Sequence, residues 1–255
     1  MKIQLLRHAT CLITFQGKNL LLDPMLSPSG TLEAVPQVPN PAKNPLVDLP
    51  ENVALNDLLA HLDGVLVTHT HRDHFDAISI NLLPKDRPLF CQTQDADKIC
   101  ESGFLAVLPV NESLSWNDFT IHRSGGQHGT GEIATKMGPV SGYILTSSNE
   151  PTLYITGDTV VCPEVRESLQ KYQPDVILSF AGAAQFHEGD PITMTLSDIF
   201  DLTQSAPHSK IVAIHMEAWN HCRLSRKELK AFLKEKLFRE GQVFVPENGE
   251  SLVFN

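Results

Sequence analysis

The sequence predicts a single domain of layered α/β type that covers residues 1–255. The chain opens with short apolar segments typical of strands, and from residue 53 onward strand-like and helix-like segments alternate. No linker, internal repeat or low-complexity tract separates the two halves. Alternating strands and helices pack in layers around a shared core, and 255 residues are enough to bury one.

The first 22 residues indicate three strands, at 3–6, 12–15 and 19–22, with a tight turn at Gln16-Gly17-Lys18. The segment 24–52 that follows contains seven of the seventeen prolines. Proline excludes both a helix and a central strand there. A long irregular connection of this kind is typical of a functional lid or a disordered linker, and a mobile loop without a role is the alternative.

The rest of the chain alternates between the two kinds of element. We expect strands at 64–68, 89–92, 105–110, 119–122, 141–146, 152–156, 176–180 and 211–214. We expect helices at 53–61, 75–83, 95–102, 164–172, 196–205 and 226–239.

Composition excludes several classes of function. The formal net charge of −10 is opposite to the basic surface of a nucleic-acid-binding protein. No apolar run approaches the ~20 residues that span a bilayer, and the N-terminus does not resemble a signal peptide. The five cysteines are widely spaced without a CxxC pair, so we expect reduced thiols and a cytoplasmic location. The oligomeric state is not indicated.

The stretch VTHTHRDHFD places four candidate metal ligands, His69, His71, Asp73 and His74, directly after an apolar strand. In an extended segment residues i and i+2 project to the same side, so His69 and His71 can face one ion. A turn then presents Asp73 and His74 from another direction. Imidazole and carboxylate suit zinc and similar metals. Four ligands so close together favour two adjacent ions, completed by ligands from elsewhere.

Three further segments end in ligands of the same kind. His128 lies in a glycine-flanked loop, Asp158 follows an apolar strand and a glycine, and His215 ends another apolar strand. Each residue has an ordinary alternative: His128 could face solvent, Asp158 could cap a helix near Pro163, and His215 could be a core histidine. The VTHTHRDHFD cluster could itself be an accidental surface feature. Their joint occurrence favours a metal site.

The segment His69-Thr70-His71-Arg72-Asp73-His74 resembles the H-x-H-x-D-H signature of the metallo-β-lactamase superfamily, and His128, Asp158 and His215 follow in the order of that family's remaining ligands. Arg7-His8-Ala9 and Leu21-Leu22-Asp23-Pro24 resemble the branch that contains L-ascorbate-6-phosphate lactonase and the N-acylphosphatidylethanolamine phospholipase D-like proteins. The motifs span residues 7 to about 222.

This resemblance implies a four-layer αββα sandwich with two divalent metal ions, zinc first and manganese or iron as alternatives. One ion would take His69, His71 and His128, the second Asp73, His74 and His215, and Asp158 would bridge them. Asp rather than Cys at the bridge is unlike the cysteine-bearing zinc β-lactamases. His rather than Glu at position 71 is unlike the flavodiiron oxidoreductases. Both differences favour hydrolysis.

The expected reaction is attack by a metal-bridging hydroxide on a small-molecule ester or lactone. The alternatives are a phosphodiesterase of the same fold, an iron-dependent oxidoreductase, or a metal-binding protein without catalysis. Asp73, His8 and His221 are the candidate catalytic residues. Weaker candidates for substrate contact are Glu217 and residues 186–188. No P-loop, dinucleotide-binding fingerprint or G-x-S-x-G elbow is present.

Overall fold

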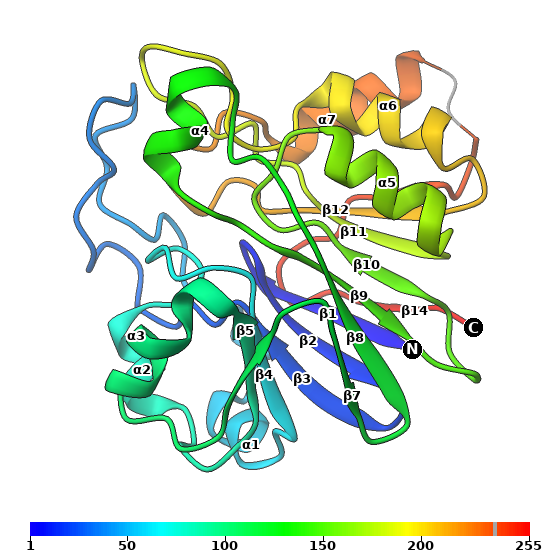
Figure 1. The fold of residues 1–255 in the computed structure, drawn as a ribbon. Coiled ribbons are helices and arrows are strands. Elements are labelled where there is room, and N and C mark those ends of the chain that lie inside the picture. Colours follow the sequence, from blue (N-terminus) through cyan, green and yellow to red (C-terminus); the bar gives the residue numbers. More distant parts are fainter. Residues whose placement is uncertain (237–238) are drawn as a thin grey trace.

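Two mixed seven-stranded sheets stack face to face with helices on both outer faces, in a computed structural model that describes residues 1–236 and 239–255 (Figure 1). The predicted four-layer αββα sandwich is confirmed. The first sheet is antiparallel from β14 to β3 and parallel from β3 to β6. In order across the sheet its strands are β14 (Ser251–Val253), β1 (Lys2–Arg7), β2 (Thr10–Phe15), β3 (Lys18–Leu22), β4 (Gly64–Val67), β5 (Leu89–Gln92) and β6 (Val107–Val110).

The second sheet repeats this arrangement, with parallel pairing from β13 to β10 and antiparallel pairing from β10 to β7. Its strands, in order across the sheet, are β13 (Val243–Phe244), β12 (Lys210–Ile214), β11 (Val176–Phe180), β10 (Leu153–Ile155), β9 (Gly142–Thr146), β8 (Phe119–Ser124) and β7 (Ser113–Trp116). The N- and C-termini lie close together because β14 pairs with β1 (Figure 1).

Parallel neighbours require crossover connections, and helices supply them on the outer faces. The first sheet is covered by α1 (Leu55–Ala60), α2 (Ala77–Leu82), α3 (Ala96–Glu101) and the short 3₁₀ helix η1 (Thr93–Asp95). The second is covered by α5 (Pro163–Tyr172), α6 (Leu196–Ser205) and α7 (Arg226–Glu235). The remaining helix, α4 (Gly131–Met137), has no fully buried residue and stands over the end of the sandwich (Figure 1).

Strands buried on both faces explain the apolar runs in the sequence. Along β11, Leu178 and Phe180 point into the core between the sheets, whereas Ile177 points to the core under α5, α6 and α7. This alternation follows from the two-residue repeat of a strand.

Four elements of the structure were not predicted from the sequence: β7, β13, β14 and α4. The two- and three-residue strands β13 and β14 exist through pairing with β12 and β1, which local sequence does not reveal. Glycines at 129, 131 and 138 made the α4 region look like a loop. The predicted helices at 53–61, 75–83 and 95–102 are shorter, and the predicted strand at 105–110 begins at Val107. Residues 237–238 of the predicted helix at 226–239 lie outside the described residues.

The proline-rich segment has no helix or strand within the described backbone of residues 23–54, apart from an isolated bridge between Leu32 and Asn44. Two buried side chains bind it to the fold. The Arg7 guanidinium donates to the carbonyls of Met25, Ser27 and Val47 at 2.8–2.9 Å. Asn220 exchanges hydrogen bonds with Val35, Asn40 and Asn44. The segment is therefore anchored beside His8 and His221. Among the described residues, no helix is long and apolar enough to cross a membrane.

Candidate metal centre

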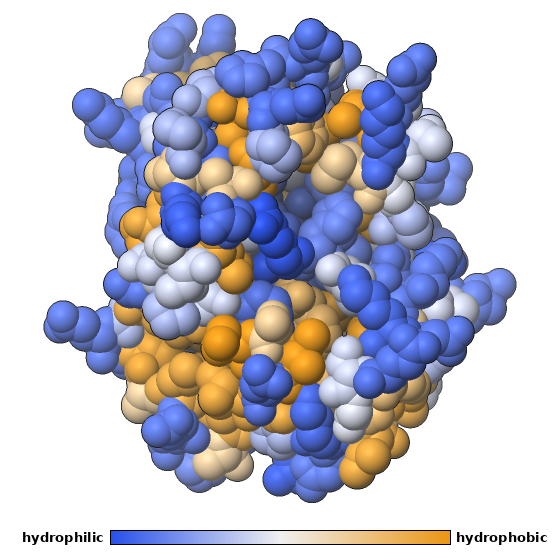
Figure 2. Space-filling view, turned by 90° about the vertical axis from the view of Figure 1, so that its left-hand side faces the viewer, coloured by the Kyte–Doolittle hydropathy of each residue, from blue (hydrophilic) through white to orange (hydrophobic). Residues whose placement is uncertain are grey.

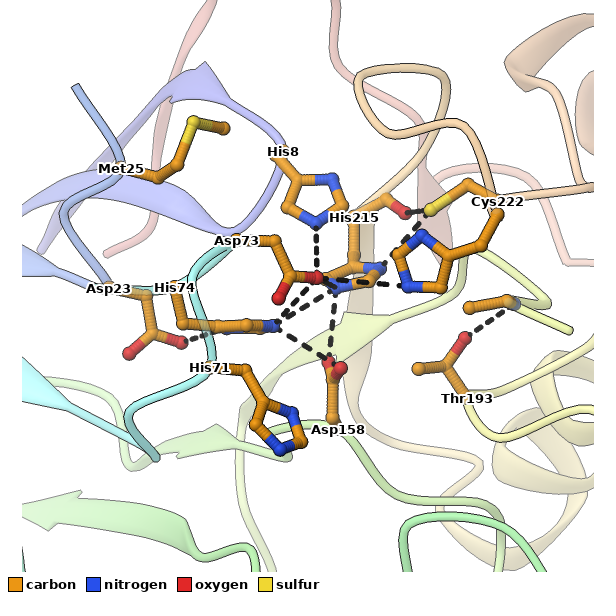
Figure 3. A network of polar contacts seen from close by, with 12 residues as sticks. His8, Asp23, Met25, His71, Asp73, His74, Asp158, Thr193, His215 and Cys222 are labelled. Carbon is orange, nitrogen blue, oxygen red and sulfur yellow. Dashed lines mark hydrogen bonds and ion pairs between the residues drawn. The ribbon is translucent and has the colours of Figure 1, made fainter. Parts of the chain in front are cut away.

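All seven predicted metal ligands meet at one edge of the sandwich, where strands from both sheets end. His69, His71, Asp73 and His74 follow β4 in the first sheet. From the second sheet, His128 follows β8, Asp158 follows β10 and His215 follows β12. Figure 3 shows side chains from both sheets converging on a shared centre. The candidate ligand atoms fall into compact groups, and within each group all lie within 4.8 Å of one another.

The first group consists of His69, His71 and His128. The His69 Nε2 and His71 Nδ1 atoms lie 3.0 Å apart. The His128 Nδ1 atom donates to the Ile192 carbonyl at 2.8 Å, so Nε2 carries the free lone pair.

The second group surrounds Asp73 and contains His8, His74 and His215. The Asp73 Oδ2 atom lies 3.4 Å from His8 Nε2, 3.6 Å from His74 Nε2 and 3.8 Å from His215 Nε2. The Nε2 atom of His221 lies at 3.8 Å from the same oxygen. Four imidazoles thus share one carboxylate oxygen.

Asp158 lies between the two groups. Its Oδ2 atom is 3.2 Å from His74 Nε2 and 3.5 Å from His128 Nε2, and its Oδ1 atom is 3.2 Å from His215 Nε2. The helix-cap alternative is excluded, because the N-cap of α5 is Cys162. The surface-cluster alternative also fails, because Asp158 and the other candidate ligands are buried, except for the half-buried His71.

Buried partners behind the ligands fix which nitrogen points inward. Asp23, at the end of β3, accepts from Thr68 N and Thr68 Oγ1 at 2.7 Å and from His74 Nδ1 at 2.8 Å. Figure 3 shows Asp23 on the far side of His74 from the centre. Because the Thr68 hydroxyl donates to Asp23, it accepts from His69 Nδ1 at 3.1 Å. The Nε2 atoms of both histidines therefore face the centre.

This donor set fits divalent metal ions. The His69 and His71 nitrogens face each other at 3.0 Å, as do His74 Nε2 and His215 Nε2 at 3.2 Å. Because the outer nitrogen of His69 donates to Thr68, His69 Nε2 presents a lone pair toward His71, where a cation can accept it. Imidazoles that donate their outer N–H to a carboxylate or carbonyl are the usual arrangement around a protein-bound metal.

Burial and charge set the protonation of these groups. Burial lowers the pKa of His69, His8 and His128, and lowers that of His221 to about 4. Burial also opposes the charged form of His74, but the Asp158 and Asp73 carboxylates outweigh it and raise its pKa well above 6.5. Neighbouring histidines in turn hold the pKa of Asp73 and Asp158 well below 3.8 against the effect of burial. The centre thus combines neutral imidazoles at His8, His69, His128 and His221 with ionised carboxylates, whereas His74 must lose a proton when it binds metal.

The backbone at the centre is closely packed. His8 and His215 both have positive φ, at 59° and 68°, and the His215 N–H donates to the His8 carbonyl at 2.9 Å. A Cβ atom on Gly182 would lie 2.2 Å from the His215 carbonyl oxygen, so only glycine fits there. This contact lets the end of β11 approach the turn that carries His215.

The remaining residues singled out in the sequence lie around the metal centre in different environments. His8 is fully buried, with its ring centroid 3.7 Å from that of His215. His221 is 6% exposed and lies in an irregular loop. Glu217 forms an ion pair with Arg226. Cys222 Sγ lies 3.8 Å from His215 Nδ1.

Sequence reasoning assigned no role to Asp23, Thr68 or Gly182. Asp23 was visible as part of Leu21-Leu22-Asp23-Pro24, an acidic residue at the end of an apolar strand, which is the same signal that identified Asp158. Thr68 and Gly182 gave no signal, since their roles depend on contacts between strands far apart in the sequence.

Comparison with known proteins agrees with this geometry. Residues 18–216 match the model of the beta-lactamase superfamily domain. The UPF0173 protein YddR of Bacillus subtilis is 37% identical over the whole of both chains. A crystal structure of "a possible metal-dependent hydrolase" from Veillonella parvula is 36% identical, with a TM-score of 0.95 and coverage of 100% of this chain and 99% of that one. The structure of an isothiocyanate hydrolase from Delia radicum gut bacteria is 34% identical, with a TM-score of 0.94 and the same coverage.

The seven converging side chains, the paired sheets and these full-length similarities lead to one assignment: the chain belongs to the beta-lactamase superfamily and, within it, to the UPF0173 family of metal-dependent hydrolases.

Proposed function

We propose that this protein hydrolyses a small molecule at an electrophilic carbon, using two divalent metal ions, zinc first, held between the ends of the two sheets. The observation that carries the proposal is the position of Asp158, whose two oxygens contact histidines of both groups. This supports one ion on His69, His71 and His128, and a second on Asp73, His74 and His215, with Asp158 shared.

Bound ions of this kind supply Lewis acidity and lower the pKa of water toward neutral pH. Three residues of the chain would orient the water, transfer the proton and stabilise the developing charge. Asp73 is 6% exposed and is the carboxylate positioned to orient the attacking water and to carry a proton to the leaving group. His221, equally exposed, is neutral and can donate a hydrogen bond to the substrate atom that gains charge. His8 is fully buried behind Asp73, so it acts as a positioning residue for that carboxylate.

Two substrate classes present such a carbon. The sequence resemblance to L-ascorbate-6-phosphate lactonase favours an ester or lactone carbonyl. The 34% identical isothiocyanate hydrolase, similar over its full length, favours the central carbon of an isothiocyanate. In both cases water adds to a carbon bonded to electronegative atoms, so one site can serve either class.

The test is turnover by metal-loaded and chelator-stripped protein on four substrate sets: isothiocyanates, lactones, carboxylic esters and phosphodiesters. We expect activity on one of the first three sets, loss on stripping, and recovery when zinc is returned. Activity confined to phosphodiesters would establish the phosphodiesterase alternative. Bound, redox-active iron without hydrolysis would favour the oxidoreductase. Two bound ions without turnover on any set would leave a metal-binding protein. The cytoplasmic location stays a prediction from the sequence.

A further inference from the structure

A cavity of about 530 Å³ lies between α4 and the loop that follows β11, within the usual size range of ligand pockets. Its lining combines apolar and polar residues: Gln37, Ile133, Met137 and Phe186, with Lys136, His187 and Glu188. Figure 2 looks onto the side of the molecule that carries α4 and the proline-rich segment in Figure 1, and this face is hollowed near its centre.

Two segments of the cavity wall, α4 and the loop at 184–192, are connected to residues of the metal centre. Only Gly129 and Thr130 separate His128 from α4, and a Cβ atom on Gly129 would lie 2.9 Å from Ile133 on the cavity wall. On the other side, the loop at 184–192 is bonded at both ends to site residues. Gln185 N donates to the His221 carbonyl at 3.0 Å, and the Ile192 carbonyl accepts from His128. The proline-rich segment closes a third side, because His187 N donates to Gln37 O at 2.7 Å.

The lining indicates what this cavity binds. Ile133 and Met137 are four residues apart and so share one face of α4, yet the helix buries no residue in the core. Both side chains, like Phe186, are only partly covered. A helix whose apolar face remains unburied is suited to contact an apolar ligand. The charged groups at the cavity, Lys136 and Glu188, are of opposite sign, so the lining does not select an anion.

We propose that this cavity binds the apolar substituent of a neutral substrate, and that Ile133, Met137 and Phe186 determine which substituents fit. The inference rests on the proposed hydrolase function and narrows its substrate class to uncharged electrophiles that carry an alkyl or aryl group. The reacting carbon would lie toward His128 and His221, and the substituent along α4.

Binding can be measured without turnover, because Met137 provides a reporter in the cavity wall. The protein is labelled with ¹³C-methyl methionine and titrated with 2-phenylethanol, a neutral probe with an aryl group. We expect the Met137 methyl signal to shift and saturate, while those of the buried Met25 and Met216 stay fixed. Ethanol, which lacks the ring, and the anion phenyl phosphate should each bind at least about tenfold more weakly, in line with the selectivity of apolar pockets for size and charge.

Two variants complete the test. Phe186→Ala should weaken binding of 2-phenylethanol about tenfold, whereas the control Leu105→Ala, which removes an 81% exposed side chain outside the cavity, should leave it unchanged. A Met137 signal that does not respond, or a response equal in Phe186→Ala and wild type, would overturn the assignment of the cavity. Saturable binding in a protein that hydrolyses none of the substrate sets would instead contradict the proposed function and leave the cavity assignment intact.

Discussion

The two sheets are built alike, but they supply the metal centre in different ways. The first sheet contributes four ligands from a single turn after β4, His69 to His74. The second contributes His128, Asp158 and His215 from the ends of three strands. The first set is local and can be recognised as a motif, whereas the second exists only when β8, β10 and β12 are aligned. The centre is therefore complete only when folding aligns the strand ends of the second sheet with the turn after β4.

The largest expected effect comes from removing the residue that joins the two groups. Removing a residue that hydrogen-bonds to a metal ligand lowers activity by up to roughly 100-fold. Asp158→Ala removes a ligand itself, so it should lower kcat/KM by more than this and should reduce the metal content per chain. Elemental analysis and turnover measure both quantities. Asp201→Ala, at a half-exposed ion pair with Arg166, is the control. Retention of both ions and full activity by Asp158→Ala would exclude the bridging role.

The next largest effect tests the hydrogen bonds that Asp23 accepts from the first-sheet residues His74 and Thr68. Asp23→Ala removes the acceptor of His74 and Thr68 and should weaken metal affinity by about 10–100-fold. Asp23→Asn keeps one acceptor oxygen and should recover part of the loss. The matched control is Asp63→Ala. It removes the carboxylate that accepts a hydrogen bond from Asn19 N at the opposite end of the same strands. Equal metal affinity in Asp23→Ala and Asp63→Ala would show that Asp23 has only a structural role.

A third effect tests the alignment of the second sheet. In Gly182→Ala the new methyl group meets the His215 carbonyl, so we expect about 1–3 kcal/mol of lost stability together with weaker metal binding. Urea unfolding of the metal-free protein and a metal titration measure the two losses. Gly125→Ala places its methyl against the flexible Glu164 side chain and should cost less. Unchanged unfolding of Gly182→Ala would mean that the close approach is not required.

The smallest effect is the pH dependence of metal binding. In the metal-free protein, burial disfavours charge on His74, but Asp158 and Asp73 outweigh it and keep this imidazole protonated at pH 7. Metal must displace that proton, so affinity should rise with pH up to the raised pKa, by at most about tenfold per pH unit for one proton. Calorimetry in buffers of different ionisation enthalpy would detect the released proton. An affinity that stays constant between pH 6 and 8 would contradict this protonation state.

The fold and the seven candidate ligands could be predicted because their signals are local. Apolar runs of strand length end in His or Asp at positions 69, 158 and 215, and the buried strands of both sheets carry such runs. Asp23, Thr68 and Gly182 act through contacts between strands distant in the sequence, which no local pattern encodes. The helix α4 was missed because its flanking glycines resemble a loop, and with it the cavity that α4 lines.

The most direct test of the account is the number of metal ions that the folded chain holds. Native mass spectrometry of the zinc-loaded protein should show two ions in the wild type, and elemental analysis should agree. His128→Ala should hold only one, since His128 contributes to the first group alone. A wild-type protein that binds no ion, or that hydrolyses its substrate at full rate after complete metal removal, would contradict a metal centre built jointly by the two sheets.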